Sequence, residues 1–341
     1  MGLLRRPVLG LAMGLGMGMG MIALAACQTV PEPVDADVPV VTQAWDSVRI
    51  GTYDNADFAR LFTDIGGYSV TYSDEDVMVL RQGNEGASVI LERMPPDAPQ
   101  ARPADAASWE PGCYWSLMVR ARDIASIVAD ARPLGWEPKT PVAYLEFGPS
   151  KLNVVVLTHQ DTGAQVQMYE RLTTPLPEDY PAFERFGVPF NIMQMASDRD
   201  ATYRFFAEDL GFATWYHGEP TRSATPEVMP LGIPVELTTI VPYRASIVSP
   251  VAGMETGRFE MIEVMGEEAG LTGRDFSNRC DSGSVGLTEV RYRVGSEDVR
   301  RIREAAKAEP DVTTSGRDTQ LLKAPDGAAI RFVGPQDSTR P

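Results

Sequence analysis

The stretch ATYRFFAEDLGF, residues 201–212, has the pattern of a short amphipathic helix that ends in a Leu-Gly-aromatic turn. Its apolar residues recur at the three- and four-residue spacing of one helix face: Tyr203, Phe206, Ala207 and Leu210. Similar phrases occur at three other places: DFARLFTDIGGY (57–68), DIASIVADARPLGW (123–136) and, more weakly, EDVRRIREAAKAEP (297–310). The chain therefore repeats one helical unit four times, and the repeat determines the predicted fold.

Each helical stretch is preceded by one strand-like run and followed by three more, which predicts a β-α-β-β-β unit. The four units cover residues 45–95, 112–172, 187–266 and 285–335, and the third carries a Pro-rich insertion at 218–241. We expect that insertion either to form a lid over a cup or to be a surface excursion. An aspartate lies at or near each helix start, where its carboxylate would cap free N–H groups: Asp57, Asp123, Asp200 and Asp298.

The pattern resembles the vicinal oxygen chelate superfamily of glyoxalases, bleomycin-resistance proteins and extradiol dioxygenases. The stretches that carry the resemblance are YWSLMVRARDIASIVADARPLGW (114–136), FNIMQMASDRDATYRFFAEDLGF (190–212), LTEVRYRVGSEDV (287–299) and LKAPDGAAIRFVGP (322–335). The resemblance spans Trp45 to Gly334 and implies an α+β fold, in which two units pair into a cup-shaped, eight-stranded sheet with helices outside. We expect neighbouring units to pair, giving one domain at 45–172 and a second at 187–335.

In metal-dependent members of that superfamily, His, Glu or Gln ligands lie on the first and last strand of each unit, inside the cup. In the first expected domain, these positions fall near Ser47, Ser116, Ile90 and Gln167. An isoleucine and two serines cannot hold a divalent metal in its usual nitrogen and oxygen shell. We therefore interpret this domain as metal-free, with Ser116 and Gln167 as polar residues that line a cup.

In the second expected domain, the matching positions are Asn191, Glu260, Glu289 and Arg331. A guanidinium has no lone pair to give to a metal, so we expect Glu289 and Arg331 to form a buried ion pair. The alternative is a hard-metal site made of Asn191, Glu260 and Glu289. Since a slip of one residue changes the face of a strand, Glu263 is the alternative to Glu260 as the inward-facing residue.

The chain has two histidines, and we expect both at the surface: His159 in a turn, and His217 after a strand of the third unit. Neither predicts a Ser/His/Asp or Cys/His site. Several large side chains on first or last strands either line the cups or pack against helices: Trp115, Met118, Met193, Met195, Tyr292 and Phe332. Two cysteines, Cys113 and Cys280, either form one disulfide or remain two separate thiols.

The N-terminus has the charged, apolar and small-residue order of a secretory signal. Arg5 and Arg6 precede an apolar run, which ends in Leu-Ala-Ala-Cys at 24–27. These four residues resemble the lipobox of bacterial lipoproteins, which implies a signal peptide at 1–26 and a lipid on Cys27. Residues 27–44 are rich in proline and aspartate and predict a flexible tether. Gln28 after the cysteine favours the outer membrane, with the protein facing the periplasm of the bacterial cell envelope.

The formal net charge of −16 argues against nucleic-acid partners, because an acidic chain repels phosphates. Three hypotheses remain for this tandem-domain lipoprotein. The favoured one is a membrane-anchored protein that binds a small organic ligand without a metal or other cofactor, like the bleomycin-resistance proteins. The first alternative is a divalent-metal-dependent enzyme of the glyoxalase, lyase or dioxygenase type that uses the second cup. The second alternative is a structural or interaction lipoprotein.

Overall fold

The computed structural model describes residues 41, 43–84, 86–306, 313–314 and 319–335. The predicted signal peptide, the lipobox with Cys27 and nearly all of the predicted tether lie outside the described residues. Within the described ranges, no helix has both the length and the apolar character needed to cross a membrane.

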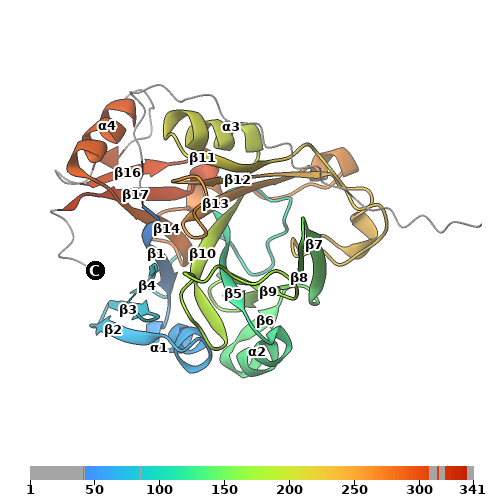
Figure 1. Cartoon of the computed structure of the whole chain (residues 1–341), viewed down its shortest axis with the longest axis horizontal. Coiled ribbons are helices and arrows are strands. Elements are labelled where there is room, and N and C mark those ends of the chain that lie inside the picture. The colour runs from blue at the N-terminus through green and yellow to red at the C-terminus, as the bar shows by residue number, and fades with distance from the viewer. Residues whose placement is uncertain (1–40, 42, 85, 307–312, 315–318, 336–341) are drawn as a thin grey trace, which may run out of the picture.

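Each of the four predicted units contains the expected helix, flanked by strands (Figure 1). The first unit consists of β1 (Trp45–Thr52), α1 (Asn55–Arg60), β2 (Ser69–Ser73), β3 (Val77–Arg81) and β4 (Ser88–Arg93). The second consists of β5 (Tyr114–Ala121), α2 (Ile124–Ala131), β6 (Trp136–Pro138), β7 (Ala143–Phe147), β8 (Ser150–His159) and β9 (Gln165–Arg171). Helix α1 continues into a π-helical turn, Leu61–Ile65.

The second half of the chain repeats this order. The third unit consists of β10 (Phe186–Met195), α3 (Arg199–Arg204), β11 (Ala213–His217), β12 (Tyr243–Ser249) and β13 (Arg258–Val264), and α3 continues into a π-helical turn, Phe205–Asp209. The fourth consists of β14 (Gly286–Arg293), α4 (Ser296–Ala306), β15 (Thr313–Thr314), β16 (Thr319–Lys323) and β17 (Ala329–Val333). The fold is α+β, as the repeat predicts.

The first unit does not pair with the second, nor the third with the fourth, so the expected pairing is wrong. One sheet has the order β15-β16-β17-β14-β1-β4-β3-β2 and joins the first unit to the fourth. The other has the order β11-β12-β13-β10-β5-β9-β8-β6, with β7 paired to β8, and joins the second unit to the third. In both sheets the first strands of two units run antiparallel side by side, β1 with β14 and β5 with β10. Because the first strand of every unit has an equivalent free edge, the order of the units along the chain does not decide which first strands pair.

The apolar stripe of each helix packs against a sheet, as the periodicity predicts. Phe58, Phe62, Ile127, Phe206 and Ile302 are almost fully buried in one common hydrophobic core. The helix caps differ from the expectation at two sites. Asp54 and Asp198 accept the backbone N–H groups at the starts of α1 and α3, so Asp57 and Asp200 are not the caps. Asp123 caps α2 as expected.

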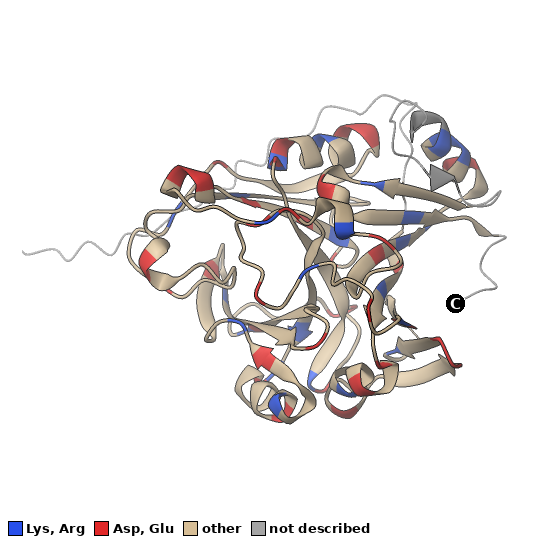
Figure 2. Ribbon diagram, turned by 180° about the vertical axis from the view of Figure 1, so that it is seen from behind, with Lys and Arg blue, Asp and Glu red and all other residues tan. Residues whose placement is uncertain are grey.

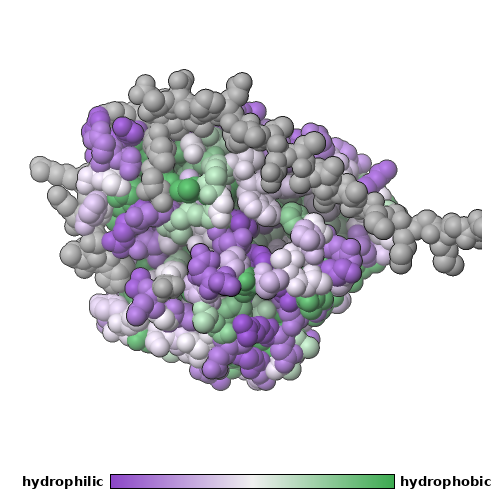
Figure 3. All heavy atoms as spheres, viewed as in Figure 1, coloured by the Kyte–Doolittle hydropathy of each residue, from purple (hydrophilic) through white to green (hydrophobic). Residues whose placement is uncertain are grey.

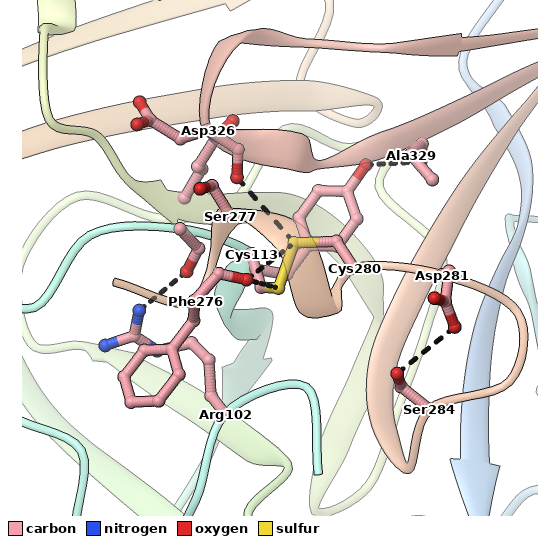
Figure 4. The surroundings of a disulfide bond; sticks show 12 residues. Arg102, Cys113, Phe276, Ser277, Cys280, Asp281, Ser284, Asp326 and Ala329 are labelled. Carbon is pink, nitrogen blue, oxygen red and sulfur yellow. Dashed lines mark hydrogen bonds between the residues drawn. A yellow bond between two sulfur atoms is a disulfide. The ribbon is translucent and has the colours of Figure 1, made fainter. Parts of the chain in front are cut away.

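A disulfide between Cys113 and Cys280 links the loop before β5 to the loop before β14 (Figure 4). The two cysteines therefore form a disulfide and are not two separate thiols. Nearby, the side chain of Glu110 accepts two hydrogen bonds of 2.8 Å from Arg274, and Arg102 donates to the carbonyl oxygens of Glu110 and Gly112. These contacts join the segment after the first unit to the segment before the fourth.

The chain's acidic residues are spread over helices and loops, with basic residues between them (Figure 2). The face seen in Figure 3 likewise mixes hydrophilic and hydrophobic residues. Most of the exposed large hydrophobic residues belong to the second and third units, including Tyr144, Phe147, Trp215 and Ile240.

Candidate functional site

Four of the six predicted cup-lining residues meet on one surface, the concave face of the sheet formed by the second and third units. Ser116 lies on β5, Gln167 on β9, Asn191 on β10 and Glu260 on β13, and these four strands are neighbours in the sheet. Two of them were expected in the first domain and two in the second. They share a face because β5 pairs with β10, which brings the last strands β9 and β13 to either side.

Hydrogen bonds tie these residues into two pairs. Ser116 Oγ donates to Gln167 Oε1 over 3.0 Å, and Gln167 Nε2 donates to the hydroxyl of Tyr169 over 2.8 Å. Asn191 Nδ2 donates to Glu260 Oε2 over 2.9 Å and lies 3.2 Å from Met118 Sδ. The choice between Glu260 and Glu263 is thereby decided, because Glu263 points to the other side, where it accepts from Arg244.

Glu260 is a buried carboxyl group without an ion pair among the described residues. Burial raises its pKa to about 7, while the hydrogen bond from Asn191 and the charge of Arg258 act in the opposite direction. A carboxylate taken out of water favours its protonated form unless a charged partner compensates. Glu260 therefore changes protonation state near neutral pH, as a group that exchanges a proton with a ligand must.

The chemistry of this donor set does not fit a resident divalent metal of the glyoxalase type. Gln167 Oε1 already accepts from Ser116 and Glu260 Oε2 already accepts from Asn191, which leaves Asn191 Oδ1 as the amide oxygen of the set without a partner among the described residues. Glu260 is the single carboxylate among the four residues, and imidazole is absent from them. The described residues contain no group of three or more His, Cys, Asp or Glu side chains placed to hold a metal ion.

Three arginines lie at one end of the same concave face, and the sequence analysis missed them. Arg120 on β5, Arg171 on β9 and Arg258 on β13 converge on the carboxylate of Glu255, with N···O distances of 3.8, 3.7 and 3.5 Å. We call Arg120, Arg171 and Arg258 the arginine cluster. With Glu255 included, this group carries an excess of two positive charges in a chain whose net charge is −16.

The arginine cluster is largely removed from solvent. The side chain of Arg120 is only 7% exposed and that of Arg258 only 6%. Burial lowers the pKa of Arg120 to about 10, and the nearby charge of Arg171 acts in the same direction. Within the described part of the chain, the buried Nε atoms of Arg120 and Arg171 have no hydrogen-bond partner. Because an unpaired buried donor is costly, this end of the sheet is suited to accept an anion.

Strand alternation is the signal that could have revealed this cluster. Residues i, i+2 and i+4 of a strand share a face. Arg120 is four residues after Ser116, Arg171 is four residues after Gln167, and Arg258 is two residues before Glu260. The predicted cup-lining positions therefore already indicated three arginines on the same face.

The other end of this concave face is filled by the insertion of the third unit. Met229, Leu231, Ile233 and Val241 are buried in one cluster with side chains of β5 and β10, which include Trp115, Met118, Met193 and Met195. The insertion is therefore neither a simple surface excursion nor a lid over open space, because it packs into the cup. Trp115 lies near the start of β5 and Arg120 near its end, so the filled region and the arginine cluster lie toward opposite ends of this strand.

The sheet of the first and fourth units contains the expected ion pair. Glu289 accepts hydrogen bonds from Arg331 at 2.8 and 2.7 Å and another from Arg291 at 2.8 Å. Burial by itself would raise the pKa of Glu289, but the hydrogen bonds and charge of Arg331 and the charge of Arg291 lower it overall. Since Glu289 is held by two guanidinium groups, it does not fit a metal ligand. Tyr292 and Phe332 pack in the core beside the helices.

The two histidines have different surroundings. His159 is buried, not exposed as expected, because its ring packs against Phe58 and Trp136. His217 is at the surface as expected, with Nδ1 2.8 Å from Ser246 Oγ and Nε2 3.9 Å from Asp200. This arrangement is not a catalytic triad, since Ser246 is fully buried and no substrate can reach its hydroxyl.

Comparisons with known proteins show the fold. No family model matches the chain, and no curated protein matches it. Among solved structures, glyoxalase I from Zea mays is 13% identical with a TM-score of 0.57, covering 86% of this chain and 93% of that one. A putative dioxygenase from Bacillus subtilis is also 13% identical, with a TM-score of 0.49, covering 87% of this chain and 86% of that one. The likeness to glyoxalase I shows the glyoxalase-like fold that the resemblance implies, and at this identity it shows the fold alone.

Proposed function

We propose that the concave face of the sheet formed by the second and third units binds a small organic anion without a metal. The arginine cluster is the observation that carries this proposal. Three guanidinium groups from three strands of one sheet meet beside one carboxylate, and two of them have buried Nε atoms without partners among the described residues. Arginine is the side chain best suited to hold a carboxylate or phosphate in a partly buried site.

The polar residues beside the cluster would hold the rest of such a ligand. Asn191 Oδ1 and both polar atoms of the Gln165 side chain are buried without a hydrogen-bond partner within the described ranges. Ligand groups that donate or accept hydrogen bonds would satisfy them. Glu260, with a pKa of about 7, would adjust its protonation state to the ligand. In this proposal the ligand is bound by the positive charge of the arginine cluster, by the amide groups of Asn191 and Gln165, and by Glu260, whose protonation state can change.

Calorimetric titration with acetate, benzoate and inorganic phosphate tests this proposal. Arg120→Gln removes one charged donor and is expected to weaken binding of these anions by about tenfold or more, since a hydrogen bond to a charged group contributes about 1.5–3 kcal/mol. The matched control is Arg132→Gln, because Arg132 is 53% exposed and forms an ion pair with Glu137 on the surface. Equal affinity in both variants, or binding of none of the three anions, contradicts the proposal.

We also propose that the chain is a lipoprotein, anchored at the outer membrane through Cys27 and facing the periplasm. The support is the sequence pattern at 1–27, together with the Cys113–Cys280 disulfide, since such bonds persist in oxidising compartments. Cys27→Ser should move the protein from the membrane fraction to the soluble fraction and abolish incorporation of labelled palmitate. An unchanged membrane fraction would contradict the anchor.

Two alternatives each have one observation in their favour. A metal-dependent enzyme of the glyoxalase or dioxygenase type is compatible with the fold, and Glu260 and Asn191 lie on the floor of its cup. A structural or interaction role is favoured by the insertion, which fills one end of that cup with Met229 and Leu231. Retention of a metal ion by the purified protein would distinguish the metal-dependent enzyme from the proposed anion-binding protein. Anion binding in the calorimetric titration would distinguish the proposed protein from a structural or interaction protein.

A further inference from the structure

We propose that the anion bound by the arginine cluster carries a flat aromatic group, and that Phe147 and Trp215 are the residues that select it. This inference rests on the proposed function, because it names the class of anion that the same site would take. It is carried by an exposed aromatic pair next to the cluster, which lies outside the hydrophobic core clusters.

Phe147 and Trp215 come from distant places in the sheet and stack on one another. Phe147 ends β7, which pairs with β8 near one edge, whereas Trp215 lies on β11, the strand at the opposite edge. Their ring centroids are 5.5 Å apart and their planes differ by 14°, a parallel stack. Two strands so far apart in strand order come together only if the sheet is strongly curved. Phe147 and Trp215 therefore contact each other across the concave side of the sheet.

Arg258 connects this aromatic pair to the arginine cluster. Its guanidinium carbon lies 4.6 Å from the centre of the Trp215 ring, while its Nη2 lies 3.5 Å from Glu255. A guanidinium over an indole ring is a favourable cation–π contact. A carboxylate bound to Arg258 would therefore place the group attached to it beside Trp215.

The exposure of the two rings indicates that they have surface left to offer a ligand. Trp215 is 40% exposed and Phe147 is 39% exposed, and Tyr216 adds a third ring 6.1 Å from Phe147. Removing large aromatic side chains from water is favourable, and such side chains stack on flat partners. A ligand that carries both a negative group and a flat ring could bind the arginine cluster with the first and contact Phe147 and Trp215 with the second.

The test compares two carboxylates of the same shape class that differ in flatness, 2-naphthoate and its saturated analogue decahydro-2-naphthoate. We expect wild-type protein to bind 2-naphthoate about fivefold more tightly by calorimetry, the ratio that corresponds to about 1 kcal/mol of aromatic contact. Trp215→Leu should reduce this ratio to near one. Arg120→Gln should weaken both ligands and leave the ratio unchanged.

Tyr72→Leu is the matched control, because Tyr72 is 44% exposed but lies on β2 in the other sheet. It should leave both affinities and their ratio unchanged. A ratio near one in the wild-type protein overturns the inference while leaving the anion site intact, and so does a ratio that persists in Trp215→Leu. Failure of both carboxylates to bind overturns the proposed function as well.

Discussion

Asn191 on β10 donates a hydrogen bond of 2.9 Å to Glu260 on β13, and this pair forms part of the floor of the concave face. Among the described side chains, Glu260 forms no ion pair, and Asn191 is its hydrogen-bond donor. An amide and a raised-pKa carboxyl group thus take the positions that metal ligands would occupy in this fold, and the arginine cluster lies beside them. The following predictions test this arrangement.

The first prediction concerns the pH dependence of stability. Glu260 has a pKa of about 7 in the folded protein, against an ordinary value of 4.5. The folded state binds the proton of Glu260 more tightly than the unfolded state does. Protonation of Glu260 therefore stabilises the folded protein fully below about pH 4.5, and this stabilisation is lost as the pH rises through 7. Glu260→Gln removes this effect. From pH 5 to 8, the wild-type free energy of unfolding in urea should fall by up to about 3 kcal/mol relative to the variant. Parallel curves for the two proteins would contradict it.

The second prediction concerns the ion pair in the other sheet. Arg331→Met leaves the buried carboxylate of Glu289 with Arg291 as its remaining hydrogen-bonded partner, and should lower the free energy of unfolding by about 3 kcal/mol. Adding Glu289→Gln to that variant removes the stranded charge and should restore part of the loss. Denaturant unfolding of both variants measures this difference. A double variant no more stable than the single one would show that the stranded charge is not the cause.

The third prediction concerns the cross-link between the two ends of the chain. Cys113 and Cys280 are separated by 167 residues, so their bond restricts a long loop in the unfolded chain. Replacing both cysteines with alanine should lower the free energy of unfolding by about 5 kcal/mol on the chain-entropy estimate. Wild-type protein in reductant should show a similar loss, whereas the variant should not respond to reductant. Equal stability of wild type and variant would be inconsistent with a structural disulfide.

The fourth prediction concerns metal content. Protein incubated separately with manganese, iron, cobalt, nickel and zinc salts, then freed of loose ions, should retain far less than one ion per chain by elemental analysis. The physical reason is the donor set, in which Glu260 stands with two amides and a serine, and Glu289 is held by Arg291 and Arg331. Retention of about one ion that disappears in Glu260→Ala would support the metal-dependent alternative instead.

The repeat and the residues facing the concave side could be predicted from sequence, because both follow from local periodicity. Helical spacing located Phe58 and Phe206, whereas the resemblance to the vicinal oxygen chelate superfamily pointed to the strand positions of Asn191 and Glu260. The ion pair between Glu289 and Arg331 followed from the cost of a buried charge. These inferences need only the pattern within one unit.

The missed features depend on contacts between units. The pairing of β5 with β10 joins strands whose edges are equivalent in sequence, so it could not be read from their order. The three arginines converge only because β10 joins β13 to the paired strands β5 and β9. His159 was expected at the surface because it was placed in a turn, yet α1 supplies Phe58 to cover it. The expected pairing of the first unit with the second and of the third with the fourth also failed because it depends on contacts between units.

The most direct measurement is a crystal structure of the protein with 4-bromobenzoate, in which the anomalous signal of bromine locates the ligand. The account predicts a carboxylate within hydrogen-bond distance of Arg120, Arg171 or Arg258, with the bromophenyl ring on the concave face of the second and third units. Well-ordered bromine sites found only elsewhere, for instance beside Glu289 in the other sheet, would contradict the central claim.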